Sequence, residues 1–240
     1  MCDATGEAVR NQNLPQKLQE KTRKRNIVRL LTRSDAVING ILAYRNLHFP
    51  AALGKGGVRA QKREGDGATP LGMWAAVKVY YRPDKVGRPA TRLPAEALRQ
   101  NDGWCDAPHD RNYNRKVTLP YPRSAERLWR DDRLYDVIVI LAYNMRPRAQ
   151  GRGSAIFMHV ARPSFKATEG CIAMRQDHLL RLLSTLSPGA VIAAGKTLTI
   201  SAGSAAGSSR GRSHASRGRV LWRRSSPHAS AGRRDGGLQR

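Results

Sequence analysis

The chain has 240 residues and a formal net charge of +25, with 40% hydrophobic and 6% aromatic residues. That hydrophobic fraction is enough for one ordinary folded domain and excludes a wholly disordered chain. No apolar run reaches the roughly 18 residues that a membrane helix needs, so no transmembrane segment is expected. Residues 1–26 also have no apolar stretch typical of a secretory signal peptide.

Three zones follow one another along the chain. Residues 1–34 are polar and basic, and we expect them to form a flexible N-terminal segment. Residues 35–200 alternate apolar runs with Gly, Pro and Asp turns, which predicts a folded domain. Residues 201–240 hold nine Arg and one Asp among Ser, Gly and Ala. This composition buries too little apolar surface to offset the entropy of ordering, so it predicts a disordered tail.

Five apolar segments of the central zone predict strands. Residues 73–81 alternate apolar and polar positions, as a strand with one buried face does. Residues 136–144 are a continuous run of Val, Ile and Leu, which is typical of a strand buried on both faces. The expected strands are residues 36–44, 73–81, 136–144, 154–161 and 191–200.

One helix has a clear amphipathic pattern. Residues 176–186 place leucines at helical spacing, and Pro188 then ends the helix. A shorter helix is expected at 94–99, where Pro stands at the first position. Residues 100–133 have weak periodicity and predict a long polar loop. Together the elements predict a mainly β domain, a β-sandwich with one or two short helices between disordered termini.

The segment 153–175 combines the parts of a thiol catalyst. His159 lies in the expected strand 154–161, and Cys171 follows it 12 residues later, after Gly170. A cysteine nucleophile needs its thiolate, a nearby base and donors for the developing oxyanion. His159 could be the base, and the backbone N–H groups of Gly170 and Cys171 could form the oxyanion hole. The positive end of the helix that follows could lower the pKa of the thiol.

A second interpretation of these two residues is structural. Cysteine is among the most buried residue types, and a histidine within an apolar strand is often a satisfied core residue. The spacing of Cys171 and His159 alone leaves both interpretations open, because Cys/His spacings do not transfer between protein families.

The motif that contains these residues resembles a known family. The order of His159, Thr168, Gly170 and Cys171 is similar to the His and Ser/Thr-x-Gly-Cys motif of YkuD-type L,D-transpeptidase catalytic domains. Many members have His before the Gly-Cys and Asn or Arg two residues after the Cys. This chain has Glu169 and Ala173 at those positions, and neither departure touches the candidate nucleophile or base.

Two further segments carry the resemblance, which covers about residues 36–195. Residues 62–74 (KREGDGATPLGMW) resemble the family's Gly and Thr-Pro-x-Gly segment before a strand. Residues 102–115 (DGWCDAPHDRNYNR) are similar to those of a compact, mainly proteobacterial branch.

The resemblance implies a reaction on peptidoglycan stem peptides. Cys171 would attack the diaminopimelate carbonyl of a stem tetrapeptide and displace D-Ala, with His159 as base and then as acid. An amine of a second stem would then take the acyl group, which gives a 3→3 crosslink. With water as acceptor, the same site would be an L,D-carboxypeptidase or another thiol amidase. The resemblance implies no cofactor, and the residues predict no metal site.

Five other residues are weaker candidates for substrate contacts. Arg162 and Arg152 flank the strand that bears His159 and could pair with substrate carboxylates. The remaining candidates are Thr168 in the motif, Tyr113 in the expected loop, and Arg175 as a substitute for the side chain that is missing at position 173.

The net charge supports a further alternative, a basic nucleic-acid-binding protein. No helix-turn-helix, zinc-finger or RRM pattern is present, so no specific nucleic acid is expected as a partner. The family resemblance implies the periplasm or cell envelope, whereas the missing signal peptide leaves the cytoplasm open.

Overall fold

The computed structural model describes residues 26–195, which contain fourteen strands, one α-helix and one 3₁₀ helix. The strands are β1 (Ile27–Leu31), β2 (Asn39–Tyr44), β3 (Leu47–Ala52), β4 (Val58–Arg59), β5 (Thr69–Pro70), β6 (Gly72–Tyr81), β7 (Ala95–Ala97), β8 (Asp102–Cys105), β9 (Arg115–Thr118), β10 (Ala125–Arg127), β11 (Val137–Leu141), β12 (Phe157–Val160), β13 (Ile172–Met174) and β14 (Val191–Ala194). The helices are η1 (Pro163–Phe165) and α3 (Gln176–Thr185).

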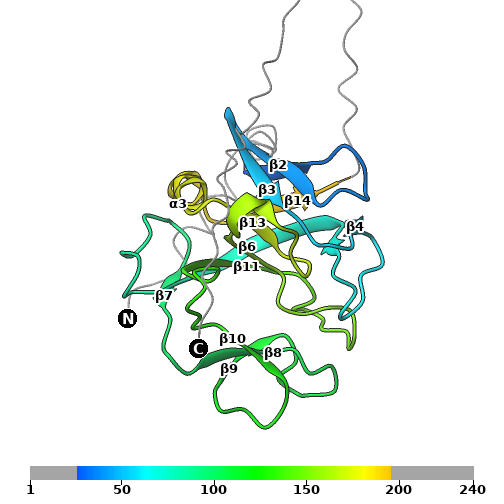
Figure 1. The fold of residues 1–240 in the computed structure, drawn as a ribbon, viewed down its shortest axis with the longest axis vertical. Coiled ribbons are helices and arrows are strands. Elements are labelled where there is room, and N and C mark those ends of the chain that lie inside the picture. The colour runs from blue at the N-terminus through cyan, green and yellow to red at the C-terminus, as the bar shows by residue number, and fades with distance from the viewer. Residues whose placement is uncertain (1–25, 196–240) are drawn as a thin grey trace, which may run out of the picture. The chain divides into compact units, whose positions relative to one another are not determined.

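The main sheet closes on itself. Its nine strands are ordered β11-β12-β13-β3-β2-β1-β14-β6-β7. Strand β6 also pairs with β11, and the two lie side by side in Figure 1. Every strand except β7 therefore belongs to a ring of pairings that leaves no free edge within it. The prediction of a mainly β domain is confirmed, and the expected sandwich takes the form of this closed ring.

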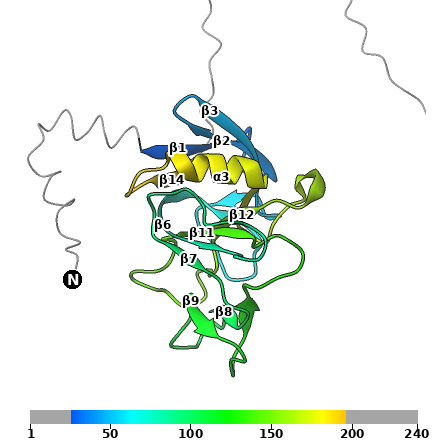
Figure 2. The same cartoon turned by 90° about the vertical axis from the view of Figure 1, so that its left-hand side faces the viewer.

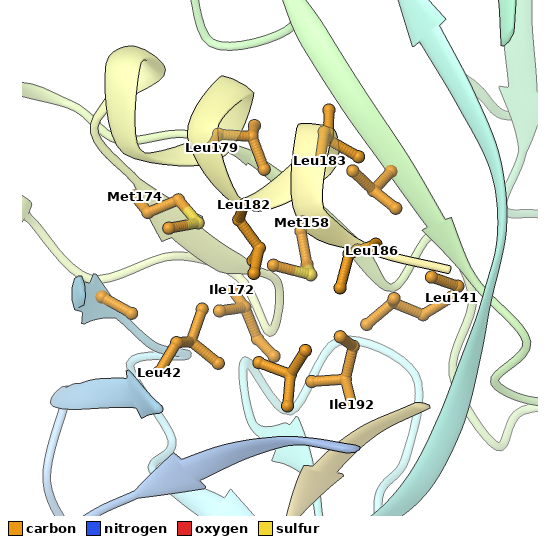
Figure 3. Packing of buried hydrophobic residues seen from close by; sticks show 14 of the residues in the cluster. Leu42, Leu141, Met158, Ile172, Met174, Leu179, Leu182, Leu183, Leu186 and Ile192 are labelled. Atoms are coloured by element: carbon orange, nitrogen blue, oxygen red, sulfur yellow. The ribbon is translucent and has the colours of Figure 1, made fainter. Parts of the chain in front are cut away.

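Helix α3 closes the core with one apolar face. In Figure 2 it lies between β1 and β2 on one side and β6 and β11 on the other. Its leucines point toward the strands, and Leu182 lies near Met158 and Ile172 in the buried cluster (Figure 3). Leu182 is fully buried, as the amphipathic pattern predicts. The predicted helix at 176–186 is confirmed to within one residue.

Truncating Leu182 to Ala is expected to lower the free energy of unfolding by about 2–5 kcal/mol, because a cavity would remain in a closed core. Urea denaturation measures the change. Arg181→Ala is the matched control: its exposed position on the same helix predicts a change within about 0.5 kcal/mol. Equal losses in the two variants would contradict this role of the leucine face.

The N-terminal boundary of the ordered part differs from the expectation. Residues 27–31, expected within the flexible segment, form β1 between β2 and β14. Val28 and Leu30 alternate into the core and are almost fully buried, and this burial holds the strand in place. Residues 1–25, the end of the expected last strand and the expected tail at 201–240 lie outside the described residues.

Two predictions for the middle of the chain are wrong. Residues 95–97 form β7 instead of a helix, because they pair in parallel with Val79, Tyr80 and Tyr81 of β6. Residues 100–133, expected as a loop, contain the three-stranded sheet β10-β8-β9. These strands have three or four residues each, too few for a periodic pattern, and cross-strand pairing stabilises them.

Within residues 26–195 there is no helix with the length and apolarity needed to cross a bilayer.

Candidate active site

Two neighbouring strands bring His159 and Cys171 to one cavity. Strand β12 pairs in parallel with β13, and His159 stands opposite Ala173 in that register. Cys171 directly precedes β13 and therefore lies beside the start of β12, where the N–H of Phe157 reaches its Sγ. Both residues line a cavity of about 540 Å³. The structure therefore brings the two candidate residues to the same cavity.

The buried imidazole of His159 has a fixed tautomer. Its Nδ1 lies 2.9 Å from the carbonyl oxygen of Val160. A carbonyl only accepts hydrogen bonds, so Nδ1 carries the proton and Nε2 keeps a lone pair. Burial lowers the pKa of His159 to about 4, and the bond to Val160 opposes this only in part. At neutral pH the imidazole is therefore uncharged and can accept a proton at Nε2.

The thiol of Cys171 is held between two backbone groups. Its Sγ donates to the carbonyl of Ala155 at 3.1 Å and accepts from the N–H of Phe157 at 3.3 Å. Burial raises the pKa of Cys171 to about 12, and the charge of Glu126 acts in the same direction. The expectation that the following helix lowers this pKa is wrong: β13 separates Cys171 from α3, and desolvation dominates. At neutral pH the thiol and the imidazole are therefore both uncharged.

The turn before Cys171 is held by a threonine. Thr168 Oγ1 donates to the carbonyl of Cys171 at 2.7 Å and accepts from the N–H of Gly170 at 3.2 Å. Thr168 lines the cavity, but both hydrogen bonds of its hydroxyl are made to the backbone of the turn. The N–H of Gly170 is bonded to this hydroxyl and is not free for an oxyanion. The oxyanion role of the Cys171 N–H stays a prediction.

Of the other predicted substrate contacts, only Arg162 lies on the cavity wall. Its side chain is exposed and makes no hydrogen bond or ion pair within residues 26–195. Arg175 instead pairs with Asp177 through two hydrogen bonds, of 3.0 and 2.9 Å. Arg152 is exposed and does not line the cavity.

Tyr113 also lies away from the cavity, but it supports the wall. It is buried, and its hydroxyl donates to Glu64, which lines the cavity. The same hydroxyl accepts the N–H of Gly153 at 3.0 Å. Tyr113 thus acts on the cavity through a neighbour and does not face a substrate.

The sequence did not indicate a group of lining residues from the 102–135 region: Asp106, Glu126, Arg130 and Tyr135. The hydroxyl of Tyr135 donates to Glu126 Oε1 at 2.7 Å. The ring of Tyr135 meets the imidazole of His159 edge to face, with 5.3 Å between centroids. The sequence could not show which way these side chains face, because the segment was expected to be a loop and therefore had no strand register.

The charge of the cavity is mixed. Its wall carries four acids and three bases: Glu64, Asp106, Glu126, Glu169, Arg130, Arg162 and Lys166. A groove for a nucleic-acid backbone is lined mainly by cations, so this cavity does not fit the nucleic-acid alternative. Within residues 26–195, no group of three His, Cys, Asp or Glu side chains is arranged to hold a metal ion.

One comparison with known proteins gives a match. The model of the family YkuD, L,D-transpeptidase catalytic domain, matches residues 32–193 and so includes both His159 and Cys171. The curated proteins and the solved structures that were compared give no match.

Proposed function

Because the chain belongs to the YkuD family of L,D-transpeptidase catalytic domains, we propose that it forms 3→3 crosslinks between peptidoglycan stem peptides. Transpeptidase-type activity on peptidoglycan is the family's activity, and the cell envelope is its usual place. The observation that carries the proposal is that two groups line one cavity, a buried thiol and an imidazole whose Nε2 can accept a proton.

The first half-reaction makes a thioester. His159 Nε2 takes the thiol proton while Cys171 Sγ attacks the carbonyl carbon of diaminopimelate in a stem tetrapeptide. Because the resting pair is neutral, the proton moves as the substrate is attacked, and no thiolate is stored beforehand. The C–N bond to D-Ala then breaks, and His159 returns the proton to the leaving amine. The N–H of Cys171 is the proposed donor to the oxyanion.

The second half-reaction transfers the acyl group. The side-chain amine of a second stem attacks the thioester carbon, the C–S bond breaks, and Cys171 regains its proton. Arg162 supports stem binding, because its exposed guanidinium stands on the cavity wall and forms no hydrogen bond or ion pair within residues 26–195. Such a group pairs well with a substrate carboxylate. If water attacks the thioester instead, the product is the trimmed tripeptide of an L,D-carboxypeptidase.

Intact-protein mass spectrometry after exposure to a carbapenem, which acylates enzymes of this family, tests the thioester step. We expect one adduct on the wild-type protein and none on Cys171→Ala. An unmodified wild-type protein, or an equal adduct on Cys171→Ala, would rule out Cys171 as the nucleophile.

Product analysis tests the second step. Purified disaccharide-tetrapeptides are incubated with the enzyme, and tandem mass spectrometry locates any new amide bond. A dimer joined between two diaminopimelate residues supports the proposal. Tripeptide without dimer would assign the chain to the carboxypeptidase alternative, and an amide at another position would refute the 3→3 linkage.

A further inference from the structure

Glu126 reaches the cavity from the small sheet, outside the main ring of strands. Strand β10 pairs antiparallel with β8, and Glu126 stands opposite Trp104 in that register. The side chain is 30% exposed and lines the same cavity as His159 and Cys171. It is therefore a carboxylate at the site for which the thioester chemistry described above has no use.

One oxygen of Glu126 is held and the other is available. The hydroxyl of Tyr135 donates to Oε1 at 2.7 Å. Arg130 lies farther away, at 3.8 Å from Oε1, and its guanidinium bonds Asp132 through two nitrogens. No donor within residues 26–195 reaches Oε2, so this oxygen can accept a hydrogen bond from a molecule in the cavity.

The surroundings of Glu126 favour uptake of a proton. Burial raises the pKa of this carboxyl group, and the charges of Asp106 and Asp132 act in the same direction. The bond from Tyr135 and the charge of Arg130 oppose the shift only in part. Glu126 in turn raises the pKa of Cys171, so the carboxylate and the thiol interact across the cavity.

The acceptor amine of the second stem carries one more proton than His159 can transfer in one turnover. An alkyl amine with a pKa near that of lysine, about 10.4, is an ammonium ion at neutral pH and has no lone pair for attack. To become an amide N–H, its nitrogen must lose two of its three protons. One of them goes through His159 to the departing sulfur of Cys171. The other needs a second base.

We propose that Glu126 is this second base: it binds the acceptor ammonium, takes one proton from it and so directs the thioester toward amines instead of water. This inference rests on the proposed thioester at Cys171. The ammonium first pairs with the free Oε2 and gives it a proton. The neutral nitrogen attacks the thioester carbon, and the C–S bond breaks. His159 carries the second proton from nitrogen to sulfur, and Glu126 later releases its proton to water.

The variant Glu126→Gln isolates this step. The amide removes the negative charge and the base, while its carbonyl oxygen still accepts the hydrogen bond from Tyr135. Glu169→Gln is the matched control, because Glu169 lines the same cavity but is exposed and paired with Lys55 at 2.8 Å. The rate of carbapenem adduct formation reports the first step, and the ratio of crosslinked dimer to tripeptide reports the fate of the thioester.

For Glu126→Gln we expect an adduct rate no lower than that of wild type, because loss of the negative charge lowers the pKa of Cys171, and a dimer-to-tripeptide ratio lower by about a hundredfold, the smaller end of a general-base contribution. Glu169→Gln should leave both readouts unchanged. An unchanged ratio in Glu126→Gln would overturn the inference. A loss of adduct formation in a folded Glu126→Gln protein would also overturn it, since Glu126 would then act on the first step.

Glu126→Asp covers the case in which the Gln variant does not fold, as checked by thermal melting. This variant keeps the base but shortens its reach, so we expect the wild-type adduct rate and a ratio lowered by about tenfold. Tyr135→Phe removes the hydroxyl that holds Oε1 of Glu126. A dimer-to-tripeptide ratio equal to that of the wild type in both Glu126→Asp and Tyr135→Phe would contradict the role of Glu126 as the second base. If the wild-type protein itself forms no adduct, it is the proposed function that fails; where it forms adduct and dimer, only the variant ratios decide the role of Glu126.

Discussion

Replacing His159 with Gln is expected to slow acylation of Cys171 by about 10²–10⁴-fold, the usual contribution of a general base. The effect should be at the upper end of this range, because burial keeps the pKa of the thiol at about 12 and leaves almost no thiolate at neutral pH. The amide of glutamine is too weakly basic to take the thiol proton, so the general-base contribution is lost. The rate of carbapenem adduct formation, followed by intact mass, measures the loss.

The pH dependence of the wild-type protein gives a second readout of the same residue. His159 has a pKa of about 4, so it is neutral above that value and protonated below it. Acylation is therefore expected to be independent of pH from about pH 5 to pH 8 and to fall as the pH drops through about 4. His109→Gln is the control, because His109 is exposed and does not line the cavity. An unaltered rate in His159→Gln would contradict the role of His159.

Gly170→Ala is expected to remove most of the acylation activity and to lower the free energy of unfolding by about 1–3 kcal/mol or more. Gly170 has a φ of +128°, which alanine rarely adopts, and an added Cβ would lie 2.7 Å from the carbonyl oxygen of Ala68. This contact is to backbone, so either Ala68 or the turn must shift. The turn carries Cys171, and a shift of the turn would displace the thiol from its place on the cavity wall.

Gly151→Ala separates backbone strain from loss of the turn. Gly151 also has a positive φ, +69°, but an added Cβ there would meet nothing within 4 Å. We expect it to cost about 1 kcal/mol and to leave the adduct rate near that of wild type. Urea denaturation and adduct formation are measured on both variants. If Gly170→Ala were acylated as fast as Gly151→Ala, the tight turn would not be needed to position the nucleophile.

The predictions from sequence succeeded where the residue pattern within one segment determines which of its faces are buried. The leucines at 179–186 can bury one face only as a helix, and the run at 137–141 is apolar enough to be a strand buried on both sides. They failed where pairing with distant strands decides the conformation. Residues 95–97 follow a proline that favours a helix start, yet β6 offers them a ladder of hydrogen bonds. The helical pattern there is too short to compete.

The same division holds for the candidate site. The sequence by itself determined the family and the mainly β architecture, and it made His159 and Cys171 the candidate pair through the family motif, whose residues lie close together along the chain. Only the tertiary structure decided that this pair is buried and neutral, since desolvation depends on everything that packs around it. It also brought Glu126 and Tyr135 to the cavity and left Arg152 and Arg175 outside. Those positions depend on the register of β8 and β10 and on the closure of the strand ring, which join residues that are distant in sequence.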